Sequence, residues 1–464
     1  MTDTMTYYTP LINDIKREKS TVTFCKVLLI LTVFFLLFRC FALIRERQND
    51  REIEYEERRQ SKYLRRWNLT EYESSKEEYY TREPPRIITA ATLHPAKTTT
   101  FDPISSEFRT CGKRIVGYYS GWNNQKLSDN QFIQITHLVF SFMKIHENGT
   151  ISFENSEKKS LFLEMKKRGK EVNSDVKVMF SMGGMFNSQH FSKLIGDFKR
   201  REIFLNSIIS FLEEYQFDGV DVFWKWPKLL DKANYVVFLR ELRQKIQNSR
   251  ILSIVTPSVG FELMEGFHLN GILKYVDFIN VETDQMNRKE GSGRFTGASS
   301  PLFFQIGEYK ENNVDWTMRH VACTTGKPSQ VNMGVPFYGR FWKGVQDPVE
   351  KGDEMWRTVD ETGSSGTVFW RNIESEGWSK ESSTWHDESK TAYIWDSENR
   401  MFLGYENEKS LKEKMKYTVE NNLGGMTIWT LEMDDDVGSL LKAVTSSEVS
   451  CEKNDKNLVK FQCI

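Results

Sequence analysis

The sequence predicts an α/β protein in which eight parallel strands and their connecting helices close into a (β/α)8 barrel. From about Cys111 onward, short β-type runs alternate with longer helical stretches, which is the pattern of repeated βα units. Eight such runs lie between Ile115 and Trp429, as this barrel requires. The gap between the seventh and eighth runs, about 341–405, is too long for a simple loop and predicts an inserted subdomain.

The expected strands are short runs rich in β-branched and aromatic residues. They are Ile115–Tyr119, His137–Met143, Val176–Ser181, Gly219–Trp224, Leu252–Pro257, Phe278–Thr283, Asn332–Val335 and Gly425–Trp429. The insertion contains further β-like runs, Thr367–Trp370 and Thr391–Trp395. We therefore expect a small α+β subdomain between strands seven and eight, within a barrel domain covering residues 111–464.

An apolar segment precedes the barrel. Residues 27–44 are apolar apart from Arg39, just long enough to cross a hydrocarbon layer of ~30 Å with the arginine reaching the interface. The preceding region is long for a secretory signal, so we expect residues 1–26 to be a cytoplasmic tail and 27–44 an uncleaved transmembrane signal-anchor. A signal peptide cleaved after Cys40-Phe41-Ala42 is the alternative, and would give a secreted protein.

Residues 45–110 cannot form a core. They are dense in charge up to Arg82 and then rich in Pro and Thr, which indicates a stalk and a linker. Sequons at Asn68 and Asn148 predict N-glycosylation and suit a lumenal or extracellular barrel. The sequence thus predicts a single-pass type II membrane glycoprotein.

Charge and cysteine content exclude several classes of function. The 63 basic and 64 acidic residues nearly cancel, so no overall field favours nucleic acid. The seven His and the Cys spacings match no metal site, and we expect no metal or cofactor. Cys25 and Cys40 lie in the anchor region. The other four, Cys111, Cys323, Cys451 and Cys463, allow three disulfide pairings, among which Cys111 with Cys451 or Cys463 suits barrel geometry.

The most informative stretch is Phe217–Pro227, which reads Phe-Asp-Gly-Val-Asp-Val-Phe-Trp-Lys-Trp-Pro. It resembles the active-site strand of the family-18 glycoside hydrolases, the chitinases, in which Asp-x-x-Asp-x-Asp-x-Glu precedes an aromatic residue and Pro. Further motifs resemble this family in the same order along the chain. They are Gly117–Tyr119 with Trp122, Thr136–Phe142, Ser181–Gly184, Gly334–Arg340, and Gly424-Gly425 with Trp429 and Asp434-Asp435.

The chain departs from the family pattern at the positions that carry out catalysis in the family. Asp218 and Asp221 keep the first two acids, but Phe223 replaces the third and Lys225 replaces the catalytic Glu. In strand six the family reads Met-x-Tyr-Asp, whereas Glu282–Gln285 places Asp284 where the Tyr would stand.

The resemblance implies that these changes abolish hydrolysis. In the family the Glu protonates the glycosidic oxygen, the neighbouring Asp orients the substrate acetamide, and the Tyr donates to its oxygen. A lysine begins near a pKa of about 10.4 and is a poor proton donor at neutral pH. Phe223 forms no hydrogen bond to an acetamide. We therefore predict a degenerate site that lacks catalytic residues.

The new charges suggest an ion pair. Alternate residues of a barrel strand point inward, so Phe223 and Lys225 share the interior with Glu282 and Asp284. A buried lone ammonium is costly, so we expect Lys225 to pair with Glu282 or Asp284. The alternative is a solvated Lys225 at the end of the strand.

Aromatic residues leave the role of the cleft open. By resemblance, Trp429 is the floor of the central sugar subsite, and Tyr118, Phe142, Tyr338 and Arg340 line the cleft, whereas a common Trp is Met185 here. The first hypothesis is a non-hydrolytic binder of chitin or related N-acetylglucosamine glycans, resembling the membrane-anchored nematode chitinase-like group. The second is an interaction scaffold with a vestigial cleft, because aromatic residues also build cores. An enzyme with altered chemistry at Lys225 is the third.

Overall fold

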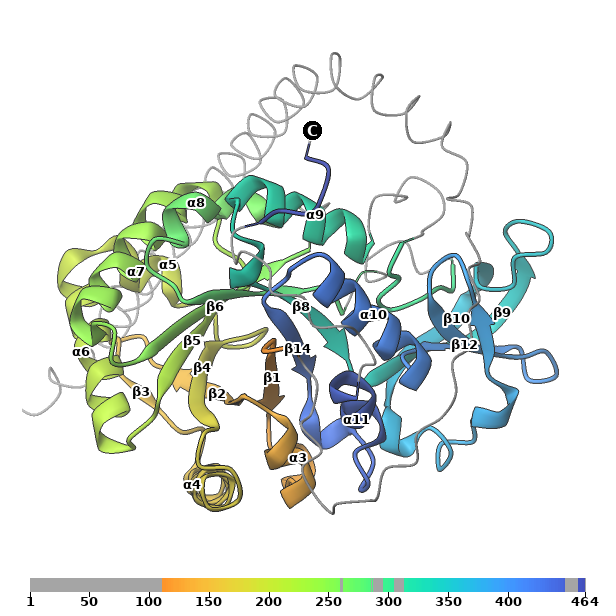
Figure 1. The fold of residues 1–464 in the computed structure, drawn as a ribbon, viewed down its shortest axis with the longest axis horizontal. Helices are drawn as coiled ribbons and strands as arrows, with labels where there is room; N and C mark the ends of the chain where they lie inside the picture. The colour runs from red at the N-terminus through yellow and green to blue at the C-terminus, as the bar shows by residue number, and fades with distance from the viewer. Residues whose placement is uncertain are drawn as a thin grey trace, which may run out of the picture. The chain divides into compact units, whose positions relative to one another are not determined.

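The computed structural model describes residues 111–258, 262–284, 286, 295–303, 313–446 and 458–463. Within these residues, eight parallel strands form a closed barrel with neighbours in the order β1-β14-β8-β7-β6-β5-β4-β2, and β2 pairs with β1 (Figure 1). The strands are β1 Arg114–Tyr119, β2 His137–Ile145, β4 Lys177–Gly183, β5 Gly219–Phe223, β6 Ile251–Pro257, β7 Phe278–Glu282, β8 Val331–Pro336 and β14 Gly425–Trp429. The predicted barrel is confirmed, and each expected strand is present with small shifts at its ends.

Helices surround the barrel and bury apolar residues against it, and several of them begin at a capping side chain. They are α3 Asp129–Gln134, α4 Ser156–Val172, α5 Phe191–Gly196, α6 Phe198–Glu214, α7 Lys232–Ile246, α8 Leu269–Ile272, α9 Val314–Thr325, α10 Glu408–Glu420 and α11 Ser439–Thr445. Asn155, Asp197 and Asn313 cap α4, α6 and α9 by accepting a backbone N–H of the first turn. Helix α6 then buries Phe204, Ile208 and other apolar residues.

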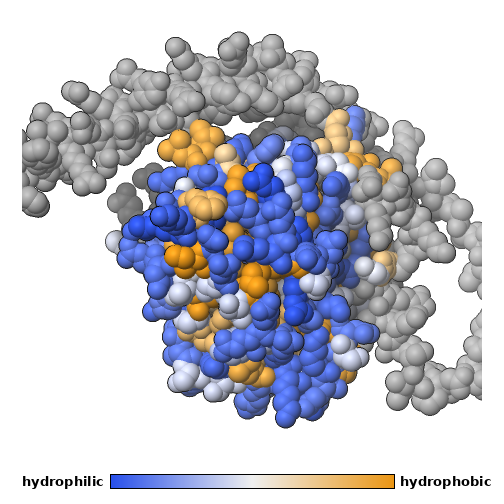
Figure 2. All heavy atoms as spheres, turned by 90° about the vertical axis from the view of Figure 1, so that its left-hand side faces the viewer, coloured by the Kyte–Doolittle hydropathy of each residue, from blue (hydrophilic) through white to orange (hydrophobic). Residues whose placement is uncertain are grey.

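One outer face of the molecule mixes hydrophilic atoms with separate hydrophobic spots. This face, on the side of α5, α6 and α7 in Figure 1, is turned toward the viewer in Figure 2. Single exposed apolar residues are normal for a soluble surface. This face therefore offers no concentrated patch that would mark a binding surface.

The insertion is a five-stranded antiparallel sheet in the order β10-β9-β13-β12-β11, and it lies beside the barrel (Figure 1). Its strands are β9 Tyr338–Pro348, β10 Arg357–Phe369, β11 Thr384–His386, β12 Thr391–Asp396 and β13 Met401–Tyr405. The expectation of an α+β subdomain is wrong, because the described residues 338–405 contain strands and short 3-10 turns but no α-helix. Trp342, Trp356, Tyr393 and Phe402 give the sheet a core of its own.

A short hairpin extends β2 and exposes a predicted glycosylation site. Strand β3, Ile151–Ser152, pairs antiparallel with β2. Asn148, in the turn between them, is exposed, and its side-chain carbonyl accepts the backbone N–H of Thr150 at 3.0 Å. The sequon is accessible, and its glycosylation stays a prediction.

Several predictions lie outside the described residues. These are the tail 1–26, the anchor 27–44, the stalk and linker 45–110, Asn68, Cys25, Cys40 and Cys451. In the described part, no helix combines the length and apolarity needed to cross a membrane.

Cysteine pairing corrects one expectation. Cys323 in α9 forms a disulfide with Cys463, and the Cα–Cα distance is 5.5 Å. Cys111 is also disulfide-bonded. The suggested pairing of Cys111 with Cys463 is therefore wrong, because Cys463 is bonded to Cys323 of α9.

Candidate functional site

The lower layer of the barrel interior is a hydrogen-bonded network around Asp221. Strand register makes Ser181 of β4 and Ser253 of β6 the neighbours of Asp221 in β5. Ser181 Oγ and Tyr118 Oη donate to Asp221 Oδ2 at 2.7 and 2.9 Å, and Ser253 Oγ donates to Oδ1 at 2.6 Å. Asn280 Nδ2 donates to Tyr118 Oη at 3.1 Å. Burial raises the pKa of Asp221, and the three hydrogen bonds oppose that rise.

Asp218 is not part of this interior. Its Oδ2 accepts the backbone N–H of Val178 at 2.7 Å and lies 2.8 Å from Lys170 Nζ of helix α4. The first acid of the motif therefore ties β4 and α4 to the start of β5. Its role here is structural.

Above the network, Phe223 fills the centre of the barrel mouth with an aromatic ring. The ring centroid lies 5.5 Å from that of Phe142, 6.1 Å from Trp429 and 6.2 Å from Tyr118. Phe223 is 5% exposed, so these contacts cover it almost completely. The Gly183–Gly184 turn allows this packing, since a Cβ on Gly183 would collide with the Phe223 carbonyl and one on Gly184 with the Phe142 ring.

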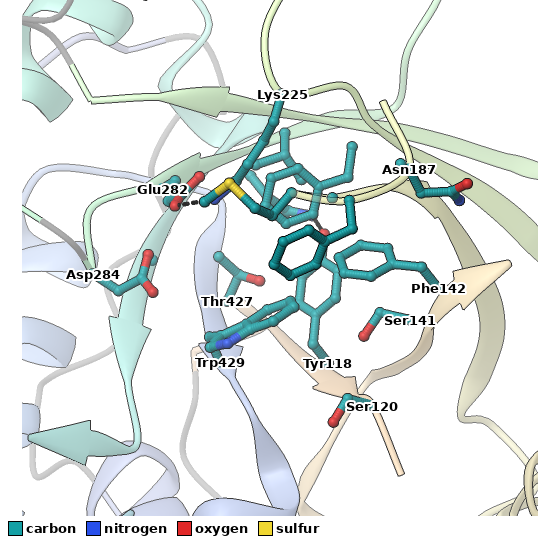
Figure 3. Close-up of a pocket in the computed structure, with 18 of the residues that line it drawn as sticks. Tyr118, Ser120, Ser141, Phe142, Asn187, Lys225, Glu282, Asp284, Thr427 and Trp429 are labelled. Carbon is teal, nitrogen blue, oxygen red and sulfur yellow. Dashed lines mark hydrogen bonds and ion pairs between the residues drawn. The ribbon is translucent and has the colours of Figure 1, made fainter. Parts of the chain in front are cut away.

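Lys225 follows β5 and bridges to β7. Its Nζ lies 2.6 Å from Glu282 Oε1, and both side chains are about nine-tenths buried, 11% and 10% exposed (Figure 3). The ammonium also lies 5.1 Å from the centre of the Phe223 ring and 5.3 Å from that of Trp226, within reach of cation–π attraction. The structure places Lys225 in an ion pair with Glu282 and leaves Asp284 as a separate carboxylate.

Asp284 lies beside this pair. Tyr338 Oη of β9 donates to Asp284 Oδ2 at 3.0 Å. Burial, followed by the negative charge of Glu282, raises the pKa of Asp284 to about 6, and Lys225 and Tyr338 oppose the rise. The carboxylate thus titrates close to neutral pH.

These groups line a cavity of about 640 Å³ at the mouth of the barrel. Tyr118, Phe142 and Trp429 lie in its wall, as Figure 3 shows. Its open rim includes the apolar side chains of Trp122, Met185 and Phe186, which are 46%, 50% and 91% exposed.

Tyr338 and Arg340 line an adjoining hollow of about 370 Å³ that is continuous with the main cavity through shared lining residues. It lies between the barrel mouth and the inserted sheet, and it shares Trp122, Asp284 and Trp429 with the main cavity. Both residues lie on β9, the strand that leaves the barrel after β8. The sequence analysis expects both residues to line the cleft, and in the structure they lie on the side of the cleft next to the inserted sheet.

The chain matches a known family along the barrel. Residues 114–434 match the family described as Glycosyl hydrolases family 18. The chain belongs to this family. It is 24% identical over 430 residues to chitinase B of Serratia marcescens, covering 75% of this chain and 86% of that one. It is 26% identical over 351 residues to human chitinase-3-like protein 2, covering 70% and 88%.

Solved family-18 structures share the fold. The group IV chitinase of Ostrinia furnacalis, in complex with allosamidin, superposes with a TM-score of 0.63 at 24% identity, over 72% of this chain and 97% of that one. Human YKL-39, described as a pseudo-chitinase with retained chitooligosaccharide binding properties, superposes with a TM-score of 0.62 at 22% identity, over 72% and 98%.

Three side chains at this family-18 site escaped the sequence analysis. Ser188 Oγ accepts the backbone N–H of Lys225 at 2.9 Å and so fixes the end of β5. Trp226 lies beside the Lys225 ammonium, and the aromatic-Pro end of the motif could have indicated it. Phe369 of β10 stacks on Trp122 with ring centres 6.3 Å apart, and no local signal predicts a contact from so distant a segment.

The lining of the cavity combines charged, polar and aromatic groups. Besides its aromatic side chains, the Lys225–Glu282 pair and the Asp284 carboxylate, it includes the polar residues Ser120, Ser141, Asn187 and Thr427. Among the described residues, no group of three or more His, Cys, Asp and Glu side chains could hold a metal ion.

Proposed function

We propose that this protein is a family-18 barrel that binds chitin-type glycans without hydrolysing them. The observation that carries the proposal is the Lys225–Glu282 ion pair, in which the motif's general-acid position holds an ammonium 2.6 Å from a carboxylate. The family places a carboxylic acid at this position as the proton donor, whereas here the Lys225 amine is held by Glu282 and points away from that role.

Two neighbouring changes support the loss of hydrolysis. Phe223, at the motif position of the acetamide-orienting Asp, offers neither charge nor a hydrogen bond. Asp284, at the position of the family's Tyr, is an acceptor when ionised and has no proton to donate. General-acid and oxyanion-type contributions are each worth roughly 100-fold or more in rate, so their joint loss leaves little turnover.

The cleft retains features suited to sugar binding. Trp429, Phe142 and Trp122 present aromatic faces along the cavity, and the apolar faces of pyranose rings pack against such surfaces. Human YKL-39, with which this chain shares its fold, is a pseudo-chitinase with retained chitooligosaccharide binding properties. We infer the same division between binding and catalysis here.

Two assays on the full-length chain test the proposal. Titration with a chitin tetramer should quench tryptophan fluorescence saturably, and Trp429→Ala should weaken the binding at least fivefold. Incubation with chitin and aryl chitooligosaccharides should release no product above blank. Reproducible hydrolysis that disappears in Lys225→Ala would overturn the assignment as a non-enzyme.

An interaction scaffold with a vestigial cleft is the second candidate. Phe223 favours the scaffold. Its ring is 5% exposed and lines the main cavity, so it occupies volume that a smaller side chain would leave to a sugar chain. No saturable quenching at millimolar tetramer, in a protein with a cooperative unfolding transition, would support the scaffold over the glycan binder.

We further propose that the barrel is lumenal or extracellular and anchored by residues 27–44. The exposed Asn148 sequon supports a glycosylated barrel. Mass mapping of the mature protein should recover residues 1–26 and a glycan on Asn148. A new N-terminus near Leu43 would instead establish a secreted form.

A further inference from the structure

The deep end of the main cavity carries two carboxylates against one ammonium. Lys225 engages Glu282 through Oε1 alone. Glu282 Oε2 is buried and accepts no hydrogen bond within the described structure. Asp284 is 5% exposed and adds a second carboxylate that lines the same cavity. A buried carboxylate oxygen without a donor is costly, so the site is suited to a ligand that supplies N–H groups and positive charge.

Other charged groups do not cancel this excess. Lys414 of α10 acts on Asp284 through space, but its ammonium is fully buried against Glu406 and the Ser300 carbonyl, which leaves that pair neutral. Arg340 lines the adjoining hollow, where its guanidinium lies 5.3 Å from the centre of the Trp342 ring.

The remaining charges of the main cavity lie toward its rim. Lys144 and Glu154 are exposed, and Lys158 is half-buried with its Nζ 3.1 Å from the Ser120 carbonyl oxygen. Exposed charges are screened by solvent and contribute little to a buried ligand. The deep end is therefore governed by Lys225, Glu282 and Asp284.

Phe223 and the two carboxylates offer an acetamide little at this end of the cavity. Phe223 packs against Phe142, Trp429 and Tyr118, so its ring takes up space and offers no hydrogen bond. Glu282 Oε2 and Asp284 are acceptors when ionised, so they match an N–H donor better than the carbonyl oxygen of an acetamide, whose donors would have to come from other lining groups such as Thr427. A free ammonium is smaller and donates three hydrogen bonds.

We propose that the cleft selects glucosamine units with a free amino group, as in partly deacetylated chitin, over N-acetylglucosamine units. The ammonium would occupy the deep end of the cavity between Glu282 Oε2 and Asp284, while the sugar rings contact Trp429 and Phe142. This inference rests on the proposed glycan-binding function and names the class of glycan. No covalent step is involved.

Asp284 makes the selection dependent on pH. The groups that act on it are Glu282, Lys225, Tyr338 and the Lys414–Glu406 pair. With a pKa of about 6, Asp284 is ionised at pH 7.5 and largely protonated at pH 5. Affinity for an amino-sugar oligomer should therefore fall as the pH decreases below the pKa of Asp284. The amino group of a glucosamine unit itself titrates near neutral pH, so affinity should also fall on the alkaline side, where the ligand loses its charge.

Calorimetric titration of the full-length protein with matched tetramers tests the proposal. At pH 7 the fully deacetylated tetramer should bind about tenfold more tightly than the N-acetylated one. A tenfold difference in Kd is the effect expected from one additional charge-assisted hydrogen bond. Asp284→Asn should lower affinity for the deacetylated tetramer about tenfold and bring the two affinities close together. Glu154→Gln removes a carboxylate from the rim of the same cavity and should leave the preference in place.

The outcomes separate the two proposals. If neither tetramer binds to a folded protein, the glycan-binding function itself fails. If the N-acetylated tetramer binds as well as or better than the deacetylated one, only the amino-sugar selection fails. An amine preference that Glu154→Gln abolishes and Asp284→Asn leaves intact would show general charge attraction at the rim, which also contradicts the proposal.

Discussion

The two layers of the barrel interior differ in how completely their polar groups are satisfied. In the lower layer, Asp221 accepts three side-chain hydrogen bonds from three other strands and is fully buried. In the upper layer, Lys225 satisfies one oxygen of Glu282, and the other oxygen has no donor within the described residues. The lower layer is complete without a ligand, whereas the upper layer is not.

This difference shows which parts of a catalytic motif also support the fold. Asp218 and Asp221 keep the family's residue types, and both join neighbouring elements of the barrel. Phe223, Lys225 and Asp284 lie at the mouth and differ from the residue types of the motif that the sequence resembles. Under the proposed non-hydrolytic function, residues at the open cavity are less constrained than acids that contribute to structure, which are costly to replace.

The largest effect is expected in the lower layer. Asp221→Ala should lower the free energy of unfolding by about 4 kcal/mol, because it leaves the three donor hydroxyls without their acceptor in a buried site. Asp221→Asn keeps the shape and one acceptor and should cost about half as much. Urea unfolding of both variants measures this. A loss under about 1 kcal/mol for the alanine variant would show that the network adds little.

An intermediate effect is expected for the ion pair in the upper layer. Glu282→Gln removes the carboxylate paired with the Lys225 ammonium, leaves Asp284 as the remaining acid beside it, and should cost about 2–4 kcal/mol. Replacing both residues by Met removes both charges together and should cost less than the single change. A double variant less stable than Glu282→Gln would contradict this account.

A smaller effect follows from the raised pKa of Asp284. Because the folded protein holds this proton up to about pH 6, against 3.8 ordinarily, the folded state binds more protons than the unfolded one between these values. The contribution of Asp284 to the free energy of unfolding is therefore fully present below about pH 4, and it is lost as the pH rises from 4 through 6. Asp284→Asn lacks this dependence, so its stability relative to wild type should improve by about 1–3 kcal/mol from pH 4 to pH 7. A difference that stays constant with pH would rule out Asp284 as the titrating group.

The smallest effect is expected for restoring the motif acid alone. Lys225→Glu should leave chitin hydrolysis at blank level, because Phe223 and Asp284 still provide neither the acetamide partner nor a donor for its oxygen. Product release from an aryl chitooligosaccharide, with a relative of known chitinase activity as the positive control, measures this. Clear turnover by the single variant would mean that one residue of the upper layer decides catalysis.

Much of the fold could be predicted from the sequence because its signals are local. Runs such as Gly219–Trp224 and Phe278–Thr283 are strands in the structure to within a residue or two. The predicted insertion ends at Tyr405, where strand β13 ends in the structure. The predicted α+β class is wrong, because the insertion is an all-β sheet. Its core includes tryptophans that are far apart in the sequence and meet only when the sheet forms. For the candidate site, the sequence predicted which residues take part but not their distances or their hydrogen-bond partners.

By itself, the sequence determined the barrel and the ordered family motifs, and it predicted a lysine, Lys225, at the motif's acid position, because periodicity and residue identity are properties of the chain alone. Only the tertiary structure decided that Lys225 pairs with Glu282 and leaves Asp284 with Tyr338. It also decided that Tyr338 and Arg340 line a second hollow. Such contacts depend on strand register, on side-chain reach across the mouth and on the path of β9 out of the barrel, and no local pattern in the sequence encodes these distances.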